Sequence, residues 1–284
     1  MKKRIVSRYR GFTLIELIVV IVVVGILSAL GGLIITNHMQ GYVDMSNRAA
    51  LVDSAESALR RMKRDVRAAL PNSINASDGS LIFLHTVAGG RYRSKCPDSS
   101  SSCTNNQTLE FNRHDTSFAM IGKLLTNSSG AIIPQRIRDS SIVVYNTGNS
   151  KADAYSHTNN ASIQGVDASA SPGNDMSPSS NFTISSREFP FRSPYKRFQI
   201  VDSQVCYVRE GRKLWRYQSN SIQNQGTCEG LGDPSLVARH VEDVNFDYEH
   251  GTATRAALLT VNATLSDAGE RITLLHQIHV LNYP

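Results

Sequence analysis

Apolar residues dominate the chain from Leu14 to Ile35, and Glu16 is the one ionisable side chain in this run. A helix needs roughly 20 predominantly apolar residues to cross a bilayer, so the run predicts a membrane helix over residues 12–35. A carboxylate inside such a helix costs about 2.5 to 3.5 kcal/mol at the bilayer centre, and less near an interface. Simple anchoring therefore does not explain why the chain carries Glu16.

A second helical pattern begins near residue 51, where apolar residues recur at steps of three and four. Charged residues fill the opposite face, and Pro71 closes the pattern. We therefore expect one long helix from about residue 13 to residue 70, whose part from 36 to 70 is amphipathic and continues into a folded head. The apolar stripe consists of Leu51, Ala55, Ala58, Leu59, Met62, Val66, Ala69 and Leu70.

Residues 72–284 predict a β-rich globular head, because short β-branched or aromatic runs alternate there with polar turns. Gly211 and Gly269 lie between such runs and predict two hairpins. Helices do not alternate with the strands, so the expected fold class is α+β, with the long N-terminal helix packed on antiparallel sheets. The strand candidates are Leu81–Val87, Thr108–Asn112, Ser141–Tyr145, Gln204–Arg209, Lys213–Tyr217, Val244–Tyr248, Ala257–Leu265 and Arg271–Leu281.

The segment from Asn146 to Thr183 is rich in Ser, Asn, Gly and Ala and has few large apolar residues. Such a composition offers little to bury, so it predicts a long polar surface loop or a disordered insertion. A receptor-binding loop is the functional alternative.

The basic residues concentrate in the leader, residues 1–11, which holds Lys2, Lys3, Arg4, Arg8 and Arg10 and no acid. Removing these from the 30 basic residues of the chain leaves 25 against 24 acidic ones, so the net charge of +6 belongs mainly to the leader. Positive charge before an apolar helix keeps the N-terminus cytoplasmic and sends the rest outward. A secretory signal cleaved near Ser28–Gly32 or a plain anchor remains an alternative, but neither accounts for Glu16.

The sequence Gly11-Phe12-Thr13-Leu14-Ile15-Glu16, after a basic leader and before a long apolar helix, resembles the type IV prepilin signal. The resemblance implies that a prepilin peptidase cuts between Gly11 and Phe12 and that Phe12 becomes the N-methylated first residue. Glu16 is then the fifth residue of the mature chain, the acid that this family uses in assembly.

If the chain is processed as a prepilin, there is a physical reason for an acid at position 16. Cleavage after Gly11 creates an ammonium at about the depth of the carboxylate, and two such charges about 4 Å apart attract by roughly 4 kcal/mol at an effective dielectric of about 20. Phe12 and Glu16 lie one turn apart, so the pair can form within one helix. It can also form between chains, and we favour this second interpretation because a helix that does not assemble has no need of the acid.

The cysteines all follow the helix, and none of their spacings matches a zinc site. Export to an oxidising compartment favours local disulfides, and we expect the pairs Cys96–Cys103 and Cys206–Cys228. No catalytic motif or metal-ligand spacing is present, so we expect no enzyme activity, no metal and no cofactor. The segment Ser185–Gln199 interleaves basic and aromatic residues, but subunit contact or ordinary packing explains it more simply than nucleic-acid binding does.

Weaker sequence patterns in the head extend the resemblance beyond the signal, to the J-like and W-like minor pilins and pseudopilins. They include Tyr207, Gly211, Leu214 and Arg216. This group implies a pilin-like fold and a low-abundance subunit that helps to initiate a pilus and lies at or near its tip. The implied partners are the prepilin peptidase, other minor pilins, the major pilin, the assembly platform and the inner membrane, with the head in the periplasm before assembly and on the surface afterwards. The alternatives are a J-type pseudopilin of a type II secretion system and a tip adhesin for DNA or a receptor.

Overall fold

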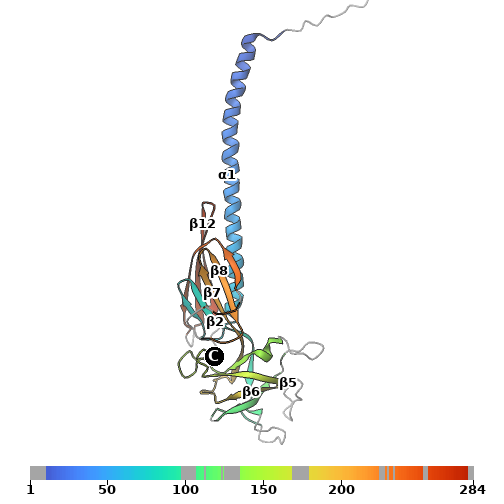
Figure 1. Ribbon diagram of the computed structural model, residues 1–284, viewed down its shortest axis with the longest axis vertical. Helices are drawn as coiled ribbons and strands as arrows, with labels where there is room; N and C mark the ends of the chain where they lie inside the picture. The colour runs from blue at the N-terminus through green and yellow to red at the C-terminus, as the bar shows by residue number, and fades with distance from the viewer. Residues whose placement is uncertain are drawn as a thin grey trace, which may run out of the picture. The chain divides into compact units, whose positions relative to one another are not determined.

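The computed structural model describes residues 11–96, 107–111, 113–122, 124, 135–167, 179–223, 228, 230–232, 234–251 and 255–280, without the side chains of residues 30–38, 135, 136 and 179. The chain forms two compact units, Met1–Ala50 and Leu51–Pro284. Figure 1 shows the long helix α1 and the strands of the second unit.

Helix α1 runs without interruption from Leu14 to Arg67, which confirms the prediction of one long helix. In the second unit its apolar stripe is buried, and Met62 and Val66 are 1% and 0% exposed. The N–H groups of Ala68 and Ala69 donate to the carbonyl groups of Asp65 and Val66, so the last turn tightens before Pro71.

Within the described part of the chain, no helix combines the length and the apolar character that a membrane crossing requires. The prediction of a crossing over residues 12–35 is therefore not supported.

The second unit contains a nine-stranded sheet and a three-stranded sheet, and every recorded pairing is antiparallel. The large sheet has the order β1-β2-β3-β6-β5-β4-β7-β8-β9, and the small one has the order β10-β11-β12. The strands are β1 Asn75–Ser77, β2 Ser80–Tyr92, β3 Asp115–Ile121, β4 Ser141–Val143, β5 Asn160–Asp167, β6 Ser179–Arg187, β7 Arg197–Glu210, β8 Lys213–Ser219, β9 Ser235–Arg239, β10 Val241–Glu249, β11 Ala257–Asp267 and β12 Glu270–Val280, with a 3₁₀ helix η2 at Gln135–Asp139.

Strands β2 and β7 connect two groups of strands in the large sheet, namely β1, β8 and β9 in one group and β3, β4, β5 and β6 in the other. They pair with each other along most of their length, and β2 also pairs with β3 while β7 also pairs with β4. Together with the pairings β3–β6, β6–β5 and β5–β4, these contacts close a ring of strands. The chain between β2 and β7 therefore supplies four strands that form a small closed sheet together with β2 and β7.

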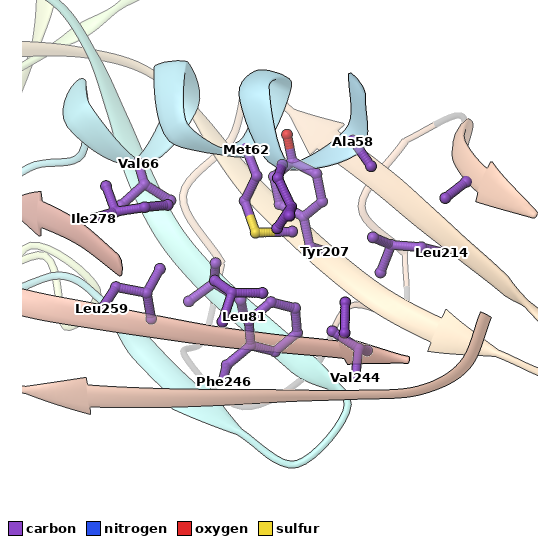
Figure 2. Close-up of a cluster of buried hydrophobic side chains, with 14 of the residues drawn as sticks. Ala58, Met62, Val66, Leu81, Tyr207, Leu214, Val244, Phe246, Leu259 and Ile278 are labelled. Carbon is purple, nitrogen blue, oxygen red and sulfur yellow. The ribbon is translucent and has the colours of Figure 1, made fainter. Parts of the chain in front are cut away.

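The described head has three clusters of buried apolar side chains, and the two larger ones are its main cores. One core lies between α1, the β2–β7–β8 region and the three-stranded sheet, and Figure 2 shows Met62 and Val66 of the helix facing Leu81, Phe246 and Leu259 from these strands. The other core lies in the ring and is rich in aromatic residues. There Phe118 stacks on Phe182 with ring centroids 5.3 Å apart, and Phe198 meets both rings edge-on.

The predicted hairpins are present: β7–β8 turns at Gly211, where φ is 59°, and β11–β12 turns at Ala268 and Gly269, where φ is 48° and 87°. A strand at Thr108–Asn112 is wrong for its described part, since residues 107–111 form no strand. The carboxylate of Asp115 instead accepts a hydrogen bond from the N–H of Glu110, at 2.9 Å, and bends the chain there.

The prediction of a polar loop over residues 146–183 holds for residues 146–159, which are turns and irregular chain, and is wrong for residues 160–167 and 179–183, which are strands. The segment contains β5 and the beginning of β6. Asn146, 1% exposed, donates to the carbonyl of Pro71 and accepts from the N–H of Ala154, at 2.8 and 3.0 Å. The Tyr155 hydroxyl donates to the carbonyl of Ser73 at 2.9 Å. Polar side chains here satisfy buried backbone groups, so the segment is ordered without a large apolar content.

Candidate assembly site

The predicted processing residues lie at the beginning of α1. Gly11, Phe12 and Thr13 precede the helix in non-helical conformation, and the first helical residue is Leu14. The carbonyl of Thr13 accepts the first helical hydrogen bond, from the N–H of Leu17 at 3.2 Å. Residues 1–10 of the predicted leader lie outside the described residues. The predicted scissile bond, between Gly11 and Phe12, thus lies just before the helix.

Thr13 is the N-cap of α1. Its Oγ1 accepts a hydrogen bond from the N–H of Glu16, at 3.4 Å. Thr at the N-cap followed by Glu at the third helical position is the capping-box spacing, in which either Glu or Gln serves, and such a cap stabilises a helix by about 1 kcal/mol. The negative charge of Glu16 is also favourable in the first turn, because the helix dipole is positive there. Glu16 therefore has a local role in its own helix besides any role in assembly.

The first turns of α1 expose apolar side chains on all sides. Phe12, Leu14 and Ile15 are 76%, 77% and 71% exposed, and the exposure of large apolar side chains continues through Leu27. A contiguous apolar surface of this kind is unstable in water and marks a surface that lipid or other protein covers. Glu16 lies within this surface.

In the head, polar side chains of α1 contact the large sheet, and Nη1 of Arg61 donates to the hydroxyl of Ser235 in β9 at 3.2 Å. Oδ2 of Asp65 accepts from Nε of Arg216 at 2.6 Å and from the hydroxyl of Tyr207 at 2.8 Å. Burial, followed by the neighbouring Asp65 carboxylate, raises the pKa of the Tyr207 hydroxyl above its ordinary value. Tyr207 and Arg216 belong to the sequence pattern that resembles the minor pilins. The structure identifies Asp65 as their common hydrogen-bond partner.

Cys206 and Cys228 form the expected disulfide, with a Cα–Cα distance of 5.8 Å. Cys206 is fully buried in β7, so the bridge holds the segment after β8 against the sheet. Cys96 is disulfide-bonded. Cys103, its predicted partner, lies outside the described residues. Among the residues that the structure describes, no cluster of His, Cys, Asp and Glu could hold a metal ion.

Residues 6–32 match the family model of the prokaryotic N-terminal methylation motif. The chain therefore carries a prepilin-type N-terminal signal. The matched residues include Gly11, Phe12 and Glu16, and the motif is consistent with processing by prepilin peptidase and assembly with other pilins. The curated proteins and the solved structures gave no match to the chain.

Sequence reasoning missed two residues of functional interest. Thr13 could have been found from its spacing to Glu16, because Ser or Thr three residues before Glu at a helix start is a capping signal. Asp65 is one of several charged residues on the helix, and its sequence context does not distinguish it from the others. Its role depends on a contact between residues 65 and 216, which only the folded chain brings together.

Proposed function

We propose that this protein is a minor type IV pilin that helps to initiate pilus assembly and lies at or near the fibre tip. The single observation that carries the proposal is the acid at position 16, four residues after the predicted new N-terminus, within an exposed apolar helix surface. In an assembled bundle the other apolar helices would cover this surface, and the carboxylate would meet the amine of the neighbouring subunit. Before assembly the same helix would anchor the precursor in the inner membrane, with the head in the periplasm.

The size of the head supports a position at the end of the fibre. The described second unit combines a three-stranded sheet with a nine-stranded sheet, part of which closes into a ring. A head of this size would crowd its neighbours as the repeating unit of a thin helical fibre, whereas fewer neighbours surround a terminal subunit. The minor pilin of this group that fits our proposal most specifically is the mannose-sensitive haemagglutinin pilus biogenesis protein MshO.

A J-type pseudopilin of a type II secretion system is the second candidate. It shares the signal, the processing and the initiating position, so the same residues support it. Deletion of the gene distinguishes the two: our proposal predicts fewer surface pili with unchanged protein secretion, and the second candidate predicts the reverse.

Two substitutions separate the assembly role of Glu16 from its capping role. Glu16→Gln keeps a side chain that can serve in a capping box but removes the charge, whereas Thr13→Ala weakens the cap and keeps the charge. We expect Glu16→Gln to reduce the number of pili strongly and Thr13→Ala to leave it near wild type, with Gly11 cleavage intact in both. Unchanged pilus number in Glu16→Gln would contradict the assembly role.

A further inference from the structure

A polar pocket of about 590 Å³ lies in the head, far along the chain from Glu16. Its walls come from η2 and the start of β4, from β5 and the turn before it, from the end of β6, and from residues that follow β8. Its volume falls in the range of roughly 300–1,000 Å³ that is usual for small-ligand sites. Part of the wall belongs to the segment whose composition predicted a loop.

The pocket favours an anionic ligand. Arg138 and Arg187 line it, and Asp139 is the one acid among the described lining residues. Nε of Arg187 is buried and has no hydrogen-bond partner within the described structure. A buried donor without an acceptor is costly, and a guanidinium matches a carboxylate in a planar, two-bond geometry. A carboxylate in the pocket would supply the missing acceptor.

The turn before β5 presents a further donor in a fixed orientation. The amide nitrogen of Asn160 lies 3.1 Å from Nδ1 of His157. An amide nitrogen only donates, so Nδ1 accepts, and the proton of the neutral ring is on Nε2. His157 has a positive φ of 55°, and the carboxylate of Asp153 holds this turn by accepting from the N–H and the hydroxyl of Ser156. The donor at His157 is therefore preorganised, which lowers the cost of binding.

The rest of the lining suits a polyhydroxylated ring. The hydroxyl groups of Ser141, Ser162 and Ser185 can each donate and accept, and Ala161 and Ile163 offer apolar surface between them. A free phosphate ion would use the guanidinium groups but would leave most of the hydroxyl groups and most of the volume unused. We propose that this pocket binds an acidic saccharide, a sugar ring that carries a carboxylate.

This binding function goes beyond the proposed role in assembly and does not depend on it, since none of the pocket residues lies in α1. The test uses the full-length chain purified in detergent micelles and measures binding by titration calorimetry. The ligands are methyl glucuronide and methyl galacturonide, the matched neutral methyl glucoside and methyl galactoside, and inorganic phosphate. The variants are Arg187→Gln and Arg138→Gln, with Arg64→Gln on the exposed face of α1 as the matched control.

We expect at least one uronide to bind about tenfold more tightly than its neutral counterpart, and phosphate to compete poorly. Each pocket variant should weaken uronide binding by about tenfold, the usual loss for one charged hydrogen bond, while Arg64→Gln binds like wild type. Arg138 is exposed, so Arg138→Gln should keep the wild-type melting temperature and decides the outcome if Arg187→Gln does not fold. Equal binding of uronide and neutral sugar, full competition by phosphate, or wild-type affinity in Arg138→Gln would overturn the proposal.

Discussion

Nε of Arg216 in β8 lies 2.6 Å from Oδ2 of Asp65 in α1, and both side chains are largely buried, at 12% and 19% exposed. The same carboxylate oxygen accepts the hydroxyl of Tyr207 from β7. The contact thus attaches the C-terminal part of α1 to the sheet of the head.

Loss of this carboxylate should destabilise the head strongly. In Asp65→Ala the Arg216 guanidinium and the Tyr207 hydroxyl lose their common partner in a largely buried place, which should lower the free energy of unfolding by about 2–4 kcal/mol. Glu56→Ala is the matched control: it breaks the Glu56–Arg60 pair on the same helix, whose side chains are 50% and 71% exposed, and should cost no more than about 0.5 kcal/mol. Urea unfolding of both variants checks this, and equal costs would contradict it.

The ordered segment after β4 should depend on Asn146. Its side chain bonds to Pro71 and Ala154 and is buried, so Asn146→Ala should cost about 2 kcal/mol and expose residues 146–160 to protease. The neighbouring exposed Ser150 gives a control, and Ser150→Ala should behave like wild type. Rapid proteolysis of this segment in the wild-type protein would contradict the ordered structure.

Reduction of the disulfides should lower stability without an effect on processing. The Cys206–Cys228 bridge closes a loop with a sequence separation of 22 residues, for which the chain-entropy model gives roughly 3 kcal/mol. The double variant Cys206→Ser, Cys228→Ser should melt at a lower temperature under oxidising conditions and show the same Gly11 cleavage. Wild-type melting of this variant would contradict a stabilising role for the bridge.

Acid should destabilise the head through His276 in β12. Burial lowers the pKa of this imidazole, and the positive charges of Lys63 and Arg67 lower it further. Because the folded-state pKa is lowered, the stabilising contribution is present above the unfolded value of about 6.5 and is lost as the pH falls below it. His276→Gln should therefore reduce the dependence of the melting temperature on pH between about 7 and 5. An unchanged dependence would show that other groups are responsible.

The sequence predicted those features that local patterns encode. The apolar stripe from Leu51 to Leu70 predicted the end of α1, at Arg67, to within a few residues. Gly211 and Gly269 predicted the hairpins, because helical periodicity and positive φ both restrict the choice of residue. The ring between β2 and β7 could not be predicted, since its closure depends on pairing between residues far apart in the chain. β5 was missed because Ile163 and Val166 are the only large apolar residues in its sequence, and because its pairing with β6 joins residues far apart in the chain.

The candidate functional residues also include some that the sequence predicts and some that it does not. Gly11, Phe12 and Glu16 form a continuous motif and were found directly. The pocket gathers Arg138, His157 and Arg187 from three separate elements, and no spacing in the sequence connects them.

The N-terminus of the mature protein tests the central claim most directly. Intact-mass measurement and N-terminal sequencing of the protein isolated from membranes should find a chain that begins with N-methylated Phe12 and lacks residues 1–11. The same measurement on Gly11→Val should find an unprocessed chain. A wild-type chain that begins at Met1, or after Gly31, would contradict the assignment of this protein as a prepilin-type subunit.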